Sequence, residues 1–175
     1  MNTNLDFSNA PDFAKTEKVS TLIWDGAPLQ YRFSGRDGLF YTARSSTSKL
    51  EMQILDWRWV EESRFRSPNQ HWLDVLFVDV DGMVSILPLK KHGAEAMSAF
   101  FKSFSKPDDF DIAPHSVLLK LSPTLMECQE YDDYWVPNDF DWHWIDSQRF
   151  GDAANWLAYE KPSNPWIVTG EVLRG

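Results

Sequence analysis

Residues 71–104, HWLDVLFVDVDGMVSILPLKKHGAEAMSAFFKSF, decide which fold this 175-residue chain can adopt. Side chains of residues 72–80 alternate between two faces that are both largely apolar, which is typical of a central strand covered on both sides. Asp81-Gly82 predicts a tight type I′ turn, because that turn needs positive φ at both central residues. The chain then returns as a second strand over residues 83–89. The apolar spacing that follows predicts a helix over residues 94–104.

Short segments separated by turn signals complete the prediction of a mainly β fold. Further strands are predicted at residues 19–24, 29–33, 39–43, 50–65, 115–122, 142–145 and 166–173, the first two forming a hairpin. Imperfect alternation within residues 50–65 indicates a β-bulge near Asp56. Pro123 is expected to end the strand at residues 115–122. A second helix is predicted over residues 150–159, with Asp152 at its N-terminus. We expect a bent antiparallel sheet or an OB-like barrel, with one or two helices. An open α+β antiparallel sheet with helices on one face is the alternative.

Composition indicates a folded chain in a reducing compartment. Hydrophobic residues make up 43% and aromatic residues 15% of the sequence, which excludes a disordered protein. We expect residues 1–17 to form a mobile arm and residues 18–175 to form one globular domain. The single cysteine, Cys128, can form no intramolecular disulfide. The N-terminus lacks the pattern of a signal peptide, and no stretch approaches the ~20 apolar residues that span a bilayer. We therefore expect a cytoplasmic protein that does not enter a membrane.

The net charge of −9 is distributed unevenly along the chain. Residues 30–104 contain ten Lys and Arg against nine acidic residues, whereas residues 105–175 contain five against thirteen. The middle of the chain could therefore contact a polyanion, while the C-terminal part would repel one.

Aromatic and cationic side chains are interleaved within and after the long predicted strand. Trp57 and Trp59 share one side of that strand, so their rings could stack on successive bases while neighbouring cations contact phosphates. Packing of these rings into the core, with the arginines reaching out to solvent, is the alternative interpretation. The candidate nucleic-acid-binding residues are Trp57, Arg58, Trp59, Arg64, Phe65, Arg66, Trp72, Lys90 and Lys91.

Residues 130–146 are both acidic and aromatic, and we expect a loop there apart from the short strand at 142–145. Such a segment could make the protein an acidic interaction or inhibitor module that binds a basic partner. The candidate residues for this alternative are Asp132, Asp133, Trp135, Asp139, Asp141, Trp142 and Trp144.

Motifs for catalysis, phosphate cradling or metal binding are not found in the sequence. Asp79 and Asp81 beside Gly82 resemble the start of a calcium loop, but the later oxygen ligands are missing. We expect no enzymatic activity, no cofactor and no metal. The function that we predict is binding of single-stranded nucleic acid without sequence preference, with DNA favoured over RNA. A carbohydrate-related enzyme or binder is a minor alternative, because paired carboxylates converge only in the fold. An exposed edge strand could also pair two copies into a homo-oligomer.

Overall fold

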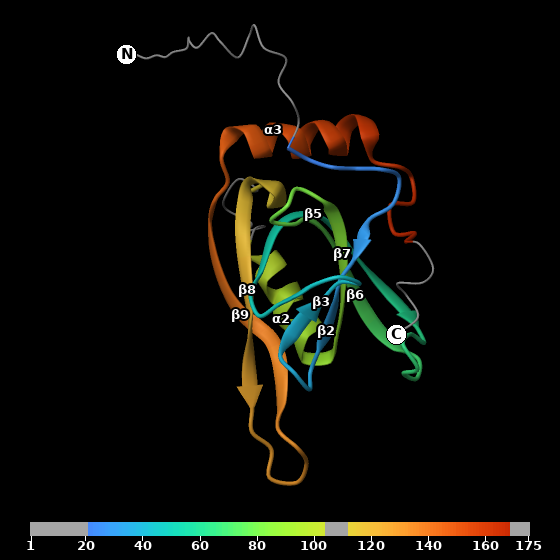
Figure 1. Ribbon diagram of the computed structural model, residues 1–175, viewed down its shortest axis with the longest axis vertical. Coiled ribbons are helices and arrows are strands. Elements are labelled where there is room, and N and C mark those ends of the chain that lie inside the picture. Colours follow the sequence, from blue (N-terminus) through green and yellow to red (C-terminus); the bar gives the residue numbers. More distant parts are fainter. Residues whose placement is uncertain (1–20, 104–111, 169–175) are drawn as a thin grey trace, which may run out of the picture.

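The computed structural model describes residues 21–103 and 112–168, which form two β-sheets and two principal helices (Figure 1). The larger sheet has six strands in the order β1-β7-β6-β5-β8-β9. These strands are β1 (Leu29–Gln30), β5 (Leu50–Glu62), β6 (Gln70–Val78), β7 (Val84–Lys90), β8 (Val117–Met126) and β9 (Tyr134–Trp144). The smaller sheet is antiparallel and contains β2 (Arg32–Ser34), β3 (Leu39–Tyr41) and β4 (Ser46–Thr47).

The prediction of a mainly β fold is confirmed, but the larger sheet does not close into a barrel. Its outer strands β1 and β9 do not pair with each other, and the pairing of β1 with β7 is parallel whereas the other described strand pairs in this sheet are antiparallel. Helix α2 (Lys91–Lys102) follows β7 directly. Helix α3 (Ser147–Asn155) continues through a π-helical turn (Trp156–Glu160), and a 3₁₀ turn (Pro114–Ser116) precedes β8. Figure 1 shows α3 across one end of the molecule and the β8–β9 hairpin projecting from the other.

The central β6–β7 hairpin is confirmed, and both faces of β6 are covered. Val75 and Phe77 pack into the main core cluster, whereas Leu76 and Val78 pack on the opposite side with Trp156, from the π-helical turn. From Trp72 to Val78 every side chain is buried and all except Asp74 are apolar, as expected of a strand between two covered faces.

The turn of this hairpin differs from the predicted type I′ turn. Gly82 has φ 87°, but Asp81 is not among the described residues with positive φ. The carboxylate of Asp79 accepts hydrogen bonds from the amides of Asp81 and Met83, both at 2.9 Å, and Gly82 N donates to Asp79 O. This is a longer loop of the type that ends in a glycine bulge. Tyr31 Oη also donates a hydrogen bond to Asp79 at 2.8 Å. The pKa of Tyr31 is raised, mainly because the hydroxyl is buried and secondly because of this hydrogen bond.

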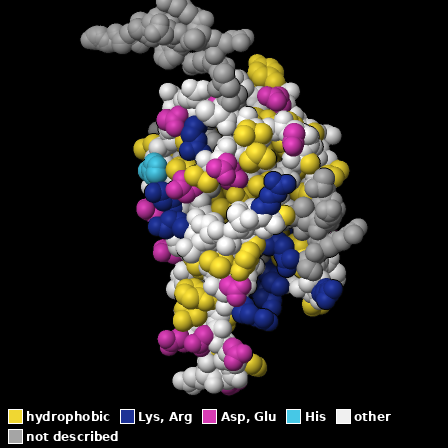
Figure 2. All heavy atoms as spheres, in the orientation of Figure 1, with side chains coloured by type: hydrophobic (Ala, Val, Ile, Leu, Met, Phe, Trp, Pro, Cys, Tyr) yellow, Lys and Arg dark blue, Asp and Glu magenta, His cyan; other side chains and the backbone are white. Residues whose placement is uncertain are grey.

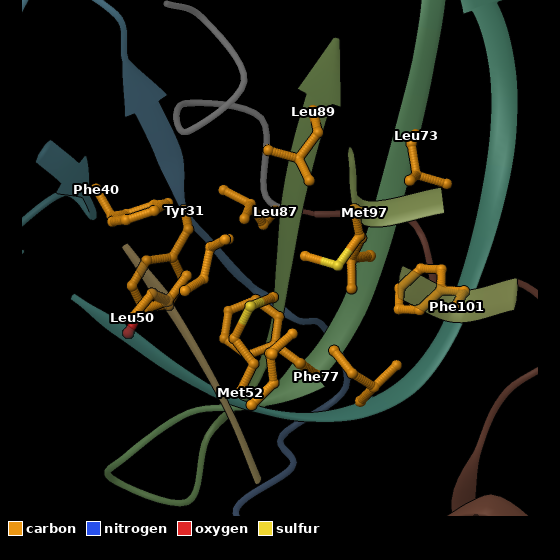
Figure 3. Close-up of a cluster of buried hydrophobic side chains, with 14 of the residues drawn as sticks. Tyr31, Phe40, Leu50, Met52, Leu73, Phe77, Leu87, Leu89, Met97 and Phe101 are labelled. Carbon is orange, nitrogen blue, oxygen red and sulfur yellow. The ribbon is translucent and has the colours of Figure 1, made fainter. Parts of the chain in front are cut away.

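A bulge in β5 bends the larger sheet, as predicted near Asp56. Residues 50–52 pair with β8, residues 53–62 pair with β6, and the register shifts between Ile54 and Asp56. Helix α2 fills the concave side of the bend. Its Met97 and Phe101 point into the cluster formed by Phe77, Leu87 and neighbouring side chains (Figure 3).

The predictions for the second half of the chain are less accurate. Residues 134–144 form one long edge strand, where a loop with a short strand at residues 142–145 was expected, and β8 continues past Pro123 through a register shift. Proline and carboxylates are depleted in central strands but are tolerated at a sheet edge, which explains the error in β9. Pro123 lies at the register shift of β8, where proline is also tolerated. The N-cap of α3 is Asp146, which accepts from Arg149 N, and Asp152 instead accepts from Thr21.

The remaining differences concern the predicted terminal strands and the first hairpin. Residues 29–33 divide between the two sheets rather than pairing with residues 21–24, of which Ile23 makes one isolated bridge to Met83. Residues 166–168 form no strand. The predicted arm at 1–17, Phe104 and residues 169–173 lie outside the described residues.

Replacing Gly82 with alanine should destabilise the fold strongly. A Cβ at this position would lie 2.0 Å from the backbone oxygen of Thr21, and φ is positive. We expect the free energy of unfolding to fall by about 3 kcal/mol or more. Gly26→Ala is the matched control, because Gly26 also has positive φ but nothing lies within 4 Å of the place where its Cβ would be. That control should cost about 1–2 kcal/mol in urea denaturation. Equal losses for the two variants would contradict the close approach at Gly82.

Candidate nucleic-acid interface

A cavity of about 540 Å³ lies where four parts of the chain meet. It is bordered by β2, by the loop between β5 and β6, by the junction of β7 with α2, and by the start of β9 with the hairpin loop before it. Figure 2 shows Lys and Arg side chains gathered on the lower part of one face, beside the projecting hairpin. The charged, imidazole and aromatic side chains that line the cavity include those of Arg32, Phe65, Trp72, Lys90, Lys91, His92, Tyr131, Tyr134 and Trp135.

The cations of this cavity have no acidic counterpart in it. Among the described residues no Asp or Glu lines the cavity, and Arg32, Lys90 and Lys91 make no ion pair. The pKa of Lys90 is lowered, first by burial and then by the charges of Lys91 and Arg32. Uncompensated positive charge around one hollow is the arrangement that attracts an anion.

Aromatic rings form the other half of the cavity wall. Tyr131 and Tyr134, on the hairpin, are 76% and 40% exposed, so their faces are accessible to a ligand. Trp135 is held in place: its amide donates to Gly35 O at 2.8 Å, and its ring lies against Gly38, where a Cβ would approach within 2.7 Å. Two accessible tyrosyl rings beside one fixed indole can stack on planar groups.

Phe65 and Trp72 form the opposite wall and are less accessible. Trp72 is only 3% exposed, and its Nε1 donates to Glu62 O. The guanidinium of Arg32 lies over the Phe65 ring at 4.4 Å, and the Lys90 ammonium lies 5.4 Å from the Trp72 ring centroid. These contacts hold two cations at the cavity by cation–π attraction without neutralising their charge.

Backbone strain is concentrated beside the same cavity. Three described residues other than glycine have positive φ: Phe65 at 51°, Arg66 at 64° and Lys91 at 52°. Phe65 and Lys91 line the cavity, and Arg66 lies between the lining residues Phe65 and Ser67. Such conformations cost about 1–3 kcal/mol each and occur preferentially at functional sites.

Four of the candidate nucleic-acid-binding residues meet at this cavity, namely Phe65, Trp72, Lys90 and Lys91. Arg66 is adjacent and exposed. Trp57, Arg58, Trp59 and Arg64 do not line it. Trp57 stacks on Phe101 with ring centroids 4.0 Å apart and packs against the core, whereas Trp59 is exposed on β5.

Arg58 and Arg64 are instead engaged with the buried carboxylate of Asp74. Arg64 binds both oxygens of Asp74, at 2.6 and 2.9 Å, and Arg58 Nε lies 3.0 Å from Oδ2. Arg64 also pairs with Glu62 at 2.7 Å. A second cavity, of about 320 Å³, lies over this group and shares Phe65 and Pro88 with the first. Its charges are therefore paired within the protein, unlike those of the larger cavity.

The acidic candidates are distributed along the hairpin and β9. Asp132 and Asp133 are exposed between the two tyrosines of the cavity, and Asp133 accepts from Cys128 N. Asp139, Asp141, Trp142 and Trp144 are exposed further along β9, away from the cavity. Trp135, from the same set, lines the cavity.

The sequence does not identify Arg32, Tyr131 and Tyr134 as nucleic-acid-binding residues, whereas His92 directly follows the candidates Lys90 and Lys91. Arg32 lies within the predicted strand at residues 29–33, but its place at the cavity depends on how these residues divide between the two sheets. The tyrosines fall in a segment whose composition predicts an acidic loop. The tyrosine-aspartate-aspartate-tyrosine-tryptophan run at 131–135 is a signal that exposed rings gather near one turn.

Within residues 21–103 and 112–168, no three His, Cys, Asp or Glu side chains are arranged to hold a metal ion. The helices of this part of the chain are too short or too polar to cross a lipid bilayer. Comparisons with models of protein families, with curated proteins and with solved structures found no match to this chain.

Neutralising Lys90 should stabilise the protein. At pH 7 this ammonium is charged in both the folded and the unfolded chain, and its lowered folded-state pKa means that the fold disfavours the charge. We expect Lys90→Gln to raise the free energy of unfolding by a few tenths of a kcal/mol, because solvent screens part of the repulsion. The gain should disappear as pH rises through the lowered pKa and beyond the unfolded value.

Thermal unfolding between pH 7 and pH 11 checks this expectation. Lys49→Gln is the control, since Lys49 is exposed outside the cavity. A Lys90→Gln variant that is less stable than the control variant at pH 7 would contradict the expectation, because the attraction of Lys90 to the Trp72 ring would then outweigh the repulsion among the cavity cations.

Proposed function

We propose that the protein binds single-stranded nucleic acid, without strong sequence preference, in the 540 Å³ cavity. The observation that carries this proposal is the combination of unpaired cations and exposed rings in one hollow without a described acidic lining residue, in a protein whose net charge is −9. The local field over a groove, rather than the net charge, decides whether a polyanion can approach it. Binding, and not catalysis, is the proposed activity.

The lining residues suggest a division of roles. Arg32, Lys90 and Lys91 would contact phosphate oxygens, and the Lys90 ammonium would regain through the anion the stabilisation that burial removes. Tyr131 and Tyr134 would stack on bases, which every base permits because each has a π-face. Stacking on exposed rings requires bases that are unpaired, which favours a single strand over a duplex.

None of these contacts selects for or against the ribose 2′-hydroxyl. The preference for DNA that we expect from the sequence therefore stays a prediction, and parallel titrations with thymidine and uridine oligomers of equal length test it.

Titration with an oligomer of about twelve thymidines at low salt should quench tryptophan fluorescence. Tyr134→Ala should weaken binding by roughly 1–3 kcal/mol if its ring stacks on a base. Lys91→Gln should weaken binding and reduce the slope of log affinity against log salt by about 0.7, the value for one phosphate contact on a single strand.

Trp59→Ala and Lys49→Gln are the matched controls, since both residues are exposed but lie outside the cavity. Both should leave the affinity unchanged within error. Loss of binding in Trp59→Ala with no effect in Tyr134→Ala would move the site to the face of β5. Absence of both quenching and a mobility shift at tens of micromolar protein would exclude the proposed function.

A further inference from the structure

The outer edge of the larger sheet is formed by β9, and no described strand pairs with its outer side. Ile145 N donates to Ser116 O at 2.9 Å, so the backbone at position 145 faces the β8 side. Backbone groups alternate along an antiparallel strand, which directs the N–H and C=O of Trp142 and Trp144 outward. The beginning of β9 is different, because Trp135 N is already bonded to Gly35 O.

The two faces beside this open edge have different chemistry. Trp142 and Trp144 lie on one face, 43% and 60% exposed, with their rings perpendicular at 5.4 Å. They extend the face on which Phe140 stacks on α2. Asp139 and Asp141 lie on the other face, are exposed, and make no ion pair among the described residues.

We propose that the edge of β9 at residues 140–144 binds a basic, extended segment of a partner protein, which joins the sheet as an additional strand. Outward amide and carbonyl groups would supply the ladder of hydrogen bonds, as in other cases of strand addition to an open edge. Lysine or arginine side chains of the partner would lie opposite Asp139 and Asp141, and apolar side chains between them would cover the two indoles.

Charge complementarity selects this occupant over a second copy of the chain. Pairing of two β9 edges would bring the Asp139 and Asp141 carboxylates of both copies onto one surface, where like charges destabilise the pairing. The inference is independent of the nucleic-acid proposal, because neither the indoles nor these carboxylates line the cavity.

The probe is an acetylated octapeptide in which lysine alternates with valine or threonine. It should bind the full-length chain at low salt, with amide chemical-shift changes centred on residues 140–144 and a change in tryptophan emission. Two N-methylated isomers of the peptide test strand addition directly. In an extended peptide alternate N–H groups point to opposite sides, so one isomer is methylated on the N–H groups of one side and the other isomer on those of the opposite side. One isomer should lose about tenfold in affinity, and the other should bind as the parent peptide does.

A charge-reversed variant, Asp139→Lys with Asp141→Lys, should weaken peptide binding by about tenfold. The control reverses two exposed carboxylates elsewhere, Asp25→Lys with Glu61→Lys, and gives the same net charge. The proposal is overturned if both methylated isomers bind equally, if the control variant loses as much affinity, or if the parent peptide does not bind at millimolar concentration. A homodimer in sedimentation experiments that the peptide does not dissociate would equally overturn it.

Discussion

The bend in β5 is the constraint on which the rest of the structure depends. Its bulge between Ile54 and Asp56 lets one strand pair with β8 at its beginning and with β6 beyond it. The two halves of the sheet therefore curve around α2, and the start of β9 reaches the junction of β7 with α2. Pro137 lies against Gly93 there, where a Cβ would approach within 3.0 Å. The cavity exists because this curvature brings a C-terminal hairpin to the end of the central one.

The described arginine and lysine side chains near the two cavities differ in whether a carboxylate pairs with them. The buried carboxylate of Asp74 is neutralised by Arg58 and Arg64, so their guanidinium groups are engaged in supporting the sheet. Arg32, Lys90 and Lys91 remain unpaired around the larger cavity among the described residues, at a cost that the lowered pKa of Lys90 reflects. Strained backbone at Phe65, Arg66 and Lys91 adds to this cost. Unpaired charge and backbone strain that lower the free energy of unfolding at one cavity are consistent with selection for a ligand there.

The sequence predicts those parts of the fold that depend on local periodicity. Both strands of the central hairpin, the helix after it and the bulge in β5 follow from alternation and helical spacing, because tertiary packing reinforces the pattern at these positions. Edge strand β9 is not predicted in full, since Pro137 and its carboxylates are disfavoured in strands except at an edge. The candidate site is predictable only in part. Lys90 and Lys91 follow a predictable strand, whereas Arg58 lies opposite Asp74 across the β5–β6 pair, and Arg64 binds the same carboxylate from the loop after β5. Tyr131 and Tyr134 reach the cavity only through the long-range curvature of the sheet.

The central claim is that one cavity, between the hairpin and the β7–α2 junction, receives a nucleic-acid strand. Photocrosslinking of the protein to an oligonucleotide that carries 5-iodouracil, followed by mass spectrometric mapping of the modified residues, tests it most directly. The account predicts adducts at Tyr131 and Tyr134 on the hairpin, and their loss when Lys90 and Lys91 are both replaced by glutamine. Adducts confined to Trp59 on β5, or to Trp142 and Trp144 on β9, would contradict it.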